Sequence, residues 1–176
     1  MTGQSDEREI YAGRIVTLRL RYLPQPDGSR WLREIVDHPP GAAVVAVDEH
    51  GHVLLVRQAR PAVAADLLEL PAGLVDPGED PPTCARRELA EETGYAAASI
   101  EPLVSFYTSP GFCTELIHIF VASGLSPVEV DHDEEEDIET VRLPLQVAIQ
   151  QVLHGEISDA KTVAGLLAYA ARASQG

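Results

Sequence analysis

Basic residues are scarce in this chain. Lysine and arginine total 13 against 28 aspartates and glutamates, which gives a net charge of -15 over 176 residues. Such an acidic chain repels the phosphates of nucleic acids and of anionic lipids, so neither is expected as a main partner. The same excess of carboxylates suits a site that gathers divalent cations.

Cysteines and long apolar runs are also lacking. The two cysteines, Cys84 and Cys113, form neither a disulfide-rich framework nor a paired-cysteine metal motif. The N-terminal residues MTGQSDEREIYAG have no basic segment followed by an apolar run, and no stretch approaches the roughly 20 apolar residues of a membrane span. We therefore expect a cytoplasmic protein with no membrane partner, and a hydrophobic fraction of 45% indicates a globular fold.

The N-terminal third of the chain has the alternation of strands. Residues from about Glu9 to Leu20 predict one strand, PQPDGS supplies a turn, and WLREIVDH predicts a second strand. The next segment, AAVVAVDEHGHVLLVRQ, predicts another hairpin, with Gly51 at the tight turn.

Helical periodicity begins after Gly73. Pro81 and Pro82 suit the first turn of a helix, Thr83 can help to cap it, and Gly94 suits its end. Further strands are expected at 101–107, 116–122 and 138–143, and helices at 144–154 and 159–173. Strands with helices inserted late, and no regular βαβ alternation, predict an α+β fold with a mixed sheet between helices.

The predicted helix carries three glutamates on one side. Glu88 and Glu92 stack one turn apart and Glu91 lies beside them, so the like charges repel by a few tenths of a kcal/mol per pair unless a cation binds between them. The alternative is a solvated surface helix, in which Arg86 and Arg87 offset the acids.

The full spacing of the stretch GLVDPGEDPPTCARRELAEETGY decides between these alternatives. Gly73, Glu79, Arg87-Glu88, Leu89, Glu91-Glu92 and Gly94 stand in the register of the Nudix box, which the segment closely resembles. Tyr95 stands where that motif usually has Ile, Leu or Val, and it can still pack as a hydrophobe. The resemblance implies the Nudix fold and hydrolysis of a nucleoside diphosphate linked to another moiety.

The resemblance also implies a set of metal ligands. Glu88 and Glu92 would bind Mg²⁺ directly, Glu91 directly or through water, and the carbonyl of Ala72 would complete the set; Mn²⁺ or another divalent cation is expected to substitute. Hard cations of this kind take oxygen ligands and keep several waters. Arg87 and Glu79 would pair to hold the loop against the helix; the alternative for them is a surface ion pair of little energetic value.

Segments outside the box resemble the ADP-ribose pyrophosphatase subfamily from about Trp31 to Ala170. They are LLVRQARP, LLELPAGLVDPGE, and Pro110-Gly111 at 16 residues beyond Gly94. Ala59 departs from the aromatic residue usual there. The resemblance gives Arg57, Arg60, Glu69, Pro110 and Gly111 as substrate-binding candidates. Arg57 is equally an edge-strand charge, and Pro-Gly is also a common turn dipeptide.

The acidic run DHDEEED at 131–137 reads as a solvated loop for most of its length. By resemblance, one glutamate of this loop positions or deprotonates the attacking water. Alignment on the following strand selects Glu136, and Glu135 and Glu139 are the alternatives.

Trp31 occupies a place similar to that of an adenine-stacking tryptophan in some members, where N-terminal strands cross to a partner subunit. It is alternatively a core or dimer-interface aromatic.

The expected organisation is residues 1–40 as dimerising strands and 41–176 as the hydrolase domain of a homodimer. The expected reaction is hydrolysis of ADP-ribose to AMP and ribose 5-phosphate. The other hypotheses are a Nudix hydrolase of a nucleotide sugar, dinucleoside polyphosphate or oxidised nucleotide, and a non-catalytic nucleotide sensor.

Overall fold

The structure is a computed structural model that describes residues 6–129 and 138–174. The chain divides into two compact units. The first contains Met1–Pro40 and Phe106–Leu116, and the second contains Gly41–Ser105 and Ile117–Gly176. Each is described by itself below. None of the helices in the described residues is long and apolar enough to cross a membrane.

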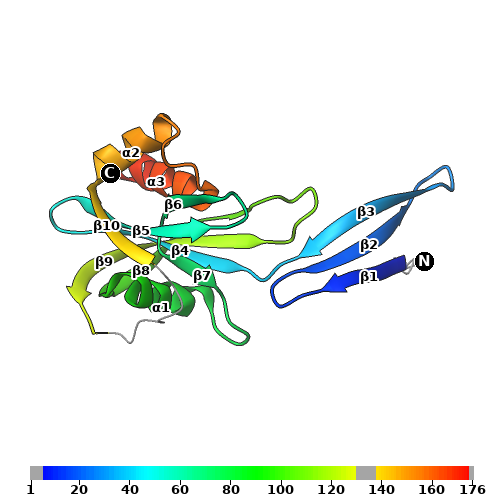
Figure 1. Ribbon diagram of the computed structural model, residues 1–176, viewed down its shortest axis with the longest axis horizontal. Helices are drawn as coiled ribbons and strands as arrows, with labels where there is room; N and C mark the ends of the chain where they lie inside the picture. The colour runs from blue at the N-terminus through cyan, green and yellow to red at the C-terminus, as the bar shows by residue number, and fades with distance from the viewer. Residues whose placement is uncertain (1–5, 130–137, 175–176) are drawn as a thin grey trace. The chain divides into compact units, whose positions relative to one another are not determined.

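The N-terminal unit is built on an antiparallel sheet in the order β1-β2-β3 (Figure 1). Its strands are β1 (Asp6–Ala12), β2 (Thr17–Pro24) and β3 (Arg30–Asp37). The predicted strand pair is therefore wrong in number, because the run from Glu9 to Leu20 forms two strands. The chain reverses where the Gly13 N–H donates to the Val16 carbonyl at 2.9 Å. A single glycine, without Pro, Asn or Asp, was the only sign of this turn.

The second unit contains a mixed sheet in the order β10-β5-β4-β9-β8, with β6 paired to β5 and β7 paired to β4. β4 is parallel to β9 and antiparallel to β5 and β7. The strands are β4 (Gly41–Val47), β5 (His52–Arg60), β6 (Ala65–Glu69), β7 (Ala72–Leu74), β8 (Tyr95–Tyr107), β9 (Leu116–Pro127) and β10 (Ile138–Pro144). The predicted hairpin at Gly51 is confirmed, with a φ of 78°.

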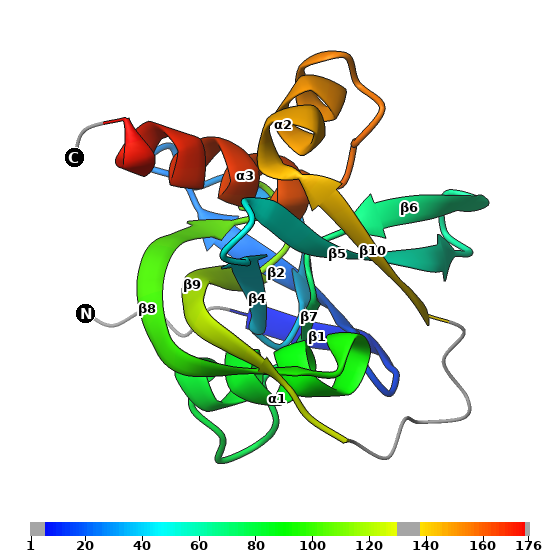
Figure 2. The ribbon, with the colours of Figure 1, turned by 90° about the vertical axis from the view of Figure 1, so that its left-hand side faces the viewer.

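Three helices cover this sheet: α1 (Pro81–Thr93), α2 (Leu145–Leu153) and α3 (Ala160–Ala173). Figure 2 shows α1 on one side of the sheet and α2 and α3 on the other. All three were predicted, and the α+β class with a mixed sheet between helices is confirmed. β6 and β7 were missed because they are short and lie in a segment that was interpreted only as the approach to the box.

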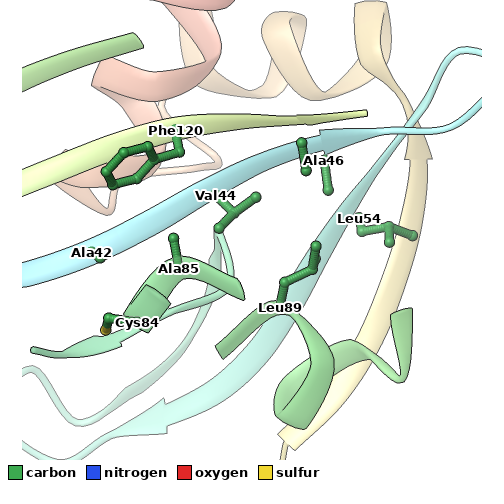
Figure 3. Packing of buried hydrophobic residues seen from close by; sticks show 9 residues of the cluster. Ala42, Val44, Ala46, Leu54, Cys84, Ala85, Leu89 and Phe120 are labelled. Carbon is green, nitrogen blue, oxygen red and sulfur yellow. The ribbon is translucent and has the colours of Figure 1, made fainter. Parts of the chain in front are cut away.

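Alternation along β4 explains how both faces become covered. Ala42, Val44 and Ala46 pack with Cys84 and Leu89 of α1, in the buried cluster drawn in Figure 3. Val45, one residue out of phase, lies on the other face, where α3 packs against it at Gly165. The completely apolar strand is what a sheet buried on both faces requires.

Candidate active site

Helix α1 begins and ends where its sequence directs. Asp80 is the N-cap, and its carboxylate accepts from the Thr83 N–H at 2.8 Å, so Thr83 is the donor to the cap and not the cap itself. Pro81 and Pro82 occupy the first helical positions. Gly94 ends the helix in the left-handed conformation with φ 70°, which a glycine adopts without strain.

Glu88 lies on the half of α1 that faces the sheet. Its side chain is only 12% exposed, and it belongs to the buried face of the helix with Cys84, Ala85 and Leu89. A Cβ atom on Gly73 of β7 would come 1.9 Å from Glu88 Oε1. A glycine at this position is therefore what allows the Glu88 carboxylate to lie against the backbone of β7.

Arg87 gathers the acidic groups around the start of the helix. Its Nε and Nη2 donate to the two oxygens of Glu79, both at 3.1 Å, and its Nη1 donates to Glu88 Oε1 at 2.6 Å and Glu91 Oε2 at 3.0 Å. Nη2 also donates to the Leu74 carbonyl at 3.2 Å. One guanidinium thus connects the loop at Glu79, β7 and two of the predicted metal-binding glutamates.

The same contacts govern the pKa values of this cluster. The hydrogen bonds that Arg87 donates to Glu79 hold the pKa of Glu79 below its ordinary value, and the same bonds raise the pKa of Arg87. Burial, followed by the charge of Glu88, raises the pKa of Cys84 to about 12. Cys84 is therefore a neutral core thiol next to the acidic groups.

Glu92 is connected to the predicted backbone ligand. The Ala72 N–H donates to Glu92 Oε2 at 2.9 Å, so the first residue of β7 and the last glutamate of α1 are in direct contact. The described residues hold no preformed group of three or more His, Cys, Asp or Glu side chains close enough to bind an ion. The available donors are nevertheless carboxylates on one helix side and an adjoining backbone segment, all oxygen ligands that fit a hard divalent cation.

A second charged cluster surrounds Glu69. Arg60 Nε and Nη2 donate to its two oxygens, each at 2.6 Å, and Lys161 Nζ donates to Oε2. The Glu69 side chain is 1% exposed. Burial raises the pKa of Glu69, but the hydrogen bonds from Arg60 and the charge of Lys161 outweigh that effect and bring it below its ordinary value. Glu69 is therefore a buried anion held between two cations.

Arg57 and Glu139 face each other across β5 and β10, with Arg57 Nε at 3.2 Å from Glu139 Oε2. Both side chains are exposed, at 46% and 70%. An exposed pair of this kind contributes little to stability, so Arg57 can leave it to contact a ligand. Glu136 and Glu135 lie outside the described residues.

The remaining candidates belong to the N-terminal unit. Trp31 lies in β3 and is 53% exposed, with the Arg33 guanidinium 5.0 Å from its ring. Pro110 and Gly111 lie in a turn closed by the Phe112 and Cys113 N–H groups, which donate to the Ser109 carbonyl at 3.1 and 2.8 Å. Trp31 is thus a surface aromatic in this unit and not a core residue.

No sequence motif marks Asp159, Lys161 or Thr162 as functional residues. Their signal was the pattern Asp-x-x-Thr before a helical period, which is typical of an N-cap. The sequence pattern predicts this cap, and in the structure Asp159 Oδ2 accepts from the Thr162 N–H at 3.0 Å. The contact between Lys161 and Glu69 could not be predicted from the sequence, because 92 residues separate them.

The structure thus brings together Gly73 of β7, the three glutamates of α1 and the Arg87 guanidinium, which contacts two of those glutamates. The model of the NUDIX domain matches residues 37–166, and the chain belongs to this family. It is 42% identical over 157 residues to the methanol dehydrogenase activator of Bacillus methanolicus, covering 88% of this chain and 85% of that protein. It is 39% identical over 158 residues to the ADP-ribose pyrophosphatase of Bacillus subtilis (strain 168), covering 89% and 85%.

The fold is also similar to a solved structure, that of an ADP compounds hydrolase. The TM-score is 0.86 at 26% sequence identity, and the match covers 97% of this chain and 94% of that one.

Proposed function

We propose that this protein hydrolyses the pyrophosphate bond of ADP-ribose in a Mg²⁺-dependent reaction that yields AMP and ribose 5-phosphate. The observation that carries the proposal is the arrangement at β7 and α1, where Glu88 rests against Gly73 and Glu92 accepts from the Ala72 N–H. The similarity to an ADP-ribose pyrophosphatase over most of both chains supports the choice of substrate.

In this proposal Glu88, Glu91, Glu92 and the carbonyl of Ala72 hold the divalent cation. A bound cation neutralises charge that builds up on phosphoryl oxygens and lowers the pKa of water; Mn²⁺ can take the place of Mg²⁺. Arg87 offsets the negative charges of Glu88 and Glu91 and, through Glu79, holds the preceding loop against α1.

The remaining residues bind substrate and move the proton. Arg60 and Arg57 contact the diphosphate, since guanidinium groups bind phosphate oxygens through two donors at once. Glu69 contributes to binding by orienting Arg60. Glu136 accepts a proton from the attacking water while the water oxygen bonds to one phosphorus. The bridging P–O bond breaks, and the other phosphate leaves with the bridging oxygen. General base catalysis of this kind typically raises the rate about 10²–10⁴-fold. Glu135 and Glu139 are the alternatives for that base.

Pro110, Gly111 and Trp31 are proposed to bind the nucleoside portion, with the Trp31 ring as a platform for adenine.

We further propose residues 1–40 as a dimerising segment and 41–176 as the hydrolase domain. The support is a set of large apolar side chains that the N-terminal unit exposes: Ile10, Tyr11, Ile15, Trp31 and Leu32. Exposed apolar side chains of this size suit burial in a protein interface, and a second copy of the chain is the proposed partner. A cytoplasmic setting is part of the proposal and agrees with two free cysteines.

A panel of nucleotides tests the proposal. Purified protein is incubated with Mg²⁺ or Mn²⁺ and with ADP-ribose, a nucleotide sugar, a dinucleoside polyphosphate or an oxidised nucleotide, and products are separated by chromatography. We expect AMP from ADP-ribose with the highest kcat/KM of the panel. A higher value for another nucleotide would transfer the assignment to that substrate. Binding without hydrolysis under either cation would indicate a nucleotide sensor.

A further inference from the structure

The first turn of α3 carries a lysine whose charge is directed into the protein. The Lys161 side chain is 14% exposed; its Nζ donates to Glu69 Oε2 and lies 3.2 Å from Asp159 Oδ1. Arg60 donates to both oxygens of the same Glu69, at 2.6 Å each. Two cations therefore share one buried carboxylate. Arg60 lies near the start of the sequence of the second unit, and Lys161 lies near its end.

The charges of the cluster balance only when Lys161 is included. Arg60 and Lys161 carry two positive charges, and Glu69 and Asp159 carry two negative ones. Without Lys161 the formal charges of the other three groups would sum to −1, from one cation and two anions. Interactions between charges are stronger at partly buried positions than in water, so that extra charge would act on anything bound near Arg60.

Arg60 is the member of the cluster that can reach a ligand. Its side chain is 39% exposed, whereas those of Glu69, Lys161 and Asp159 are 1%, 14% and 16% exposed. The hydrogen bond to Glu69 raises the pKa of Arg60, burial opposes that effect, and the charges of Glu69, Asp159 and Glu92 add to it, so Glu92 lies within reach of the guanidinium. A guanidinium at the surface beside the carboxylates of α1 is well situated for a phosphate group.

The position of Lys161 is fixed by its neighbour in the helix. Thr162 Oγ1 accepts from the Leu70 N–H at 2.8 Å and donates to Asp159 Oδ2 at 2.6 Å. Thr162 is fully buried. Because Leu70 directly follows Glu69, this bond holds the first turn of α3 at a constant distance from the Glu69 carboxylate.

We propose that Lys161 is a positioning residue for substrate binding: it holds Glu69 and offsets its negative charge, so that Arg60 presents an effective positive charge to a phosphate of the nucleotide. The inference rests on the proposed function, in which Arg60 contacts the diphosphate. Lys161 itself does not touch the substrate, because its Nζ is engaged by Glu69 and Asp159.

The test compares Lys161→Met with the double variant Lys161→Met/Asp159→Asn, in which Asn can still cap α3 and the Arg60–Glu69 pair is left intact. The nucleotide is the one that the wild type hydrolyses best, and its Kd is measured by calorimetry in EDTA alongside kcat and KM with Mg²⁺. For Lys161→Met we expect Kd and KM to rise about tenfold, the scale of one partly screened unit charge near a phosphate, with kcat changed less than about threefold. The double variant restores a neutral cluster, so Kd and KM should return to within about threefold of wild type.

Two further variants keep the test decisive. Lys161→Arg retains the charge and should lie closer to wild type than Lys161→Met in Kd. If Lys161→Met fails to fold, Lys161→Gln replaces it, since its amide can still donate to Glu69 without the charge. The matched control is Arg172→Met, which removes an exposed ion pair with Glu101 (3.0 Å) from the other end of α3 and should leave Kd and KM unchanged.

Two results would overturn the proposal. Unchanged Kd and KM in Lys161→Met, with only a lower Tm, would show a purely structural role. A double variant as weak as Lys161→Met would show that Lys161 acts on the substrate directly. Preference of the wild type for a nucleotide other than ADP-ribose would refute the proposed substrate alone, because the same variants are then judged on that nucleotide.

Discussion

Gly73 and Glu88 approach each other so closely that the glycine's missing side chain shapes the site. A Cβ at Gly73 would lie 1.9 Å from Glu88 Oε1 and 2.2 Å from Glu88 Cδ. The Glu88 carboxylate therefore packs against the backbone of β7, and Arg87 Nη1 donates to the same Oε1 at 2.6 Å. The first glycine of the box is required by this contact and not by a left-handed φ, since Gly73 is not among the positive-φ glycines.

Replacing Gly73 with alanine should therefore damage activity more than stability. The added methyl group displaces the end of a flexible side chain, and displacement of a reacting geometry by about 1 Å can lower the rate by about 100-fold. We expect kcat with Mg²⁺ to fall by that order while Tm falls by only a few degrees. Steady-state kinetics and thermal unfolding monitored by circular dichroism measure both. Near-normal kcat in a folded Gly73→Ala protein would show that Glu88 is not positioned by β7.

The sequence could predict α1 and its three glutamates because the helix periodicity, the prolines and Gly94 are local signals. It could not predict that Arg87 divides its donors among Glu79, Glu88 and Glu91, since that depends on the path of the loop before the helix. The Lys161–Glu69 contact was still further out of reach, because it arises from how α3 packs on the sheet.

The N-terminal strands show the opposite limit. Their alternation was clear, but the turn at Gly13 carried too weak a signal to divide one strand into two. The proposed base, Glu136, lies outside the described residues, and it was selected by the family resemblance aligned on the strand that ends at Leu143-Pro144.

The ion pair between Arg87 and Glu79 should give the protein a pH-dependent component of stability. The pKa of Glu79 is lower in the folded protein than the ordinary value near 4.3, because Arg87 hydrogen-bonds the charged form. The stabilisation is therefore fully present above about pH 4.3 to 5 and is lost as the pH falls through the lower folded pKa. We expect Glu79→Gln to be less stable than wild type by a constant amount at pH 6 to 8, with the difference shrinking below pH 4.

Urea unfolding at a series of pH values from 3 to 8 measures this difference. Glu101→Gln is the matched control, because it removes an exposed carboxylate paired with Arg172 and should show a much smaller difference throughout. A difference between Glu79→Gln and wild type that stays constant down to pH 3 would contradict the role given to the pair.

Glu92→Gln should separate metal binding from folding. The amide oxygen can still accept from the Ala72 N–H, as Glu92 Oε2 does at 2.9 Å, so the contact between α1 and β7 survives. The lost negative charge weakens the proposed cation site. We expect kcat to fall by about 100-fold or more, beyond the 10- to 100-fold range typical of groups that support metal ligands. Titration with Mn²⁺ followed by electron paramagnetic resonance should show weaker binding at an unchanged Tm. Turnover like that of the wild type would mean that the metal site lies elsewhere.

Gly165→Ala should test how tightly α3 is packed. A Cβ at this position would lie 2.6 Å from Leu70 Cδ1, 3.2 Å from Ile119 Cδ1 and 3.3 Å from Val45 Cγ2, all in the core. Alanine favours a helix over glycine by about 1 kcal/mol, but overpacking costs about 1–3 kcal/mol. Because Leu70 and Ile119 are 0% and 1% exposed and packed in the core, the cost of overpacking should exceed the gain in helix propensity, with a net loss of about 1 kcal/mol in the free energy of unfolding.

Ala171→Gly on the exposed side of the same helix is the control for helix propensity, and it should lower the free energy of unfolding by about 1 kcal/mol without any clash. Urea denaturation of both variants at neutral pH gives the comparison, and a Gly165→Ala protein more stable than the wild type would show that α3 can shift away from the sheet at no cost.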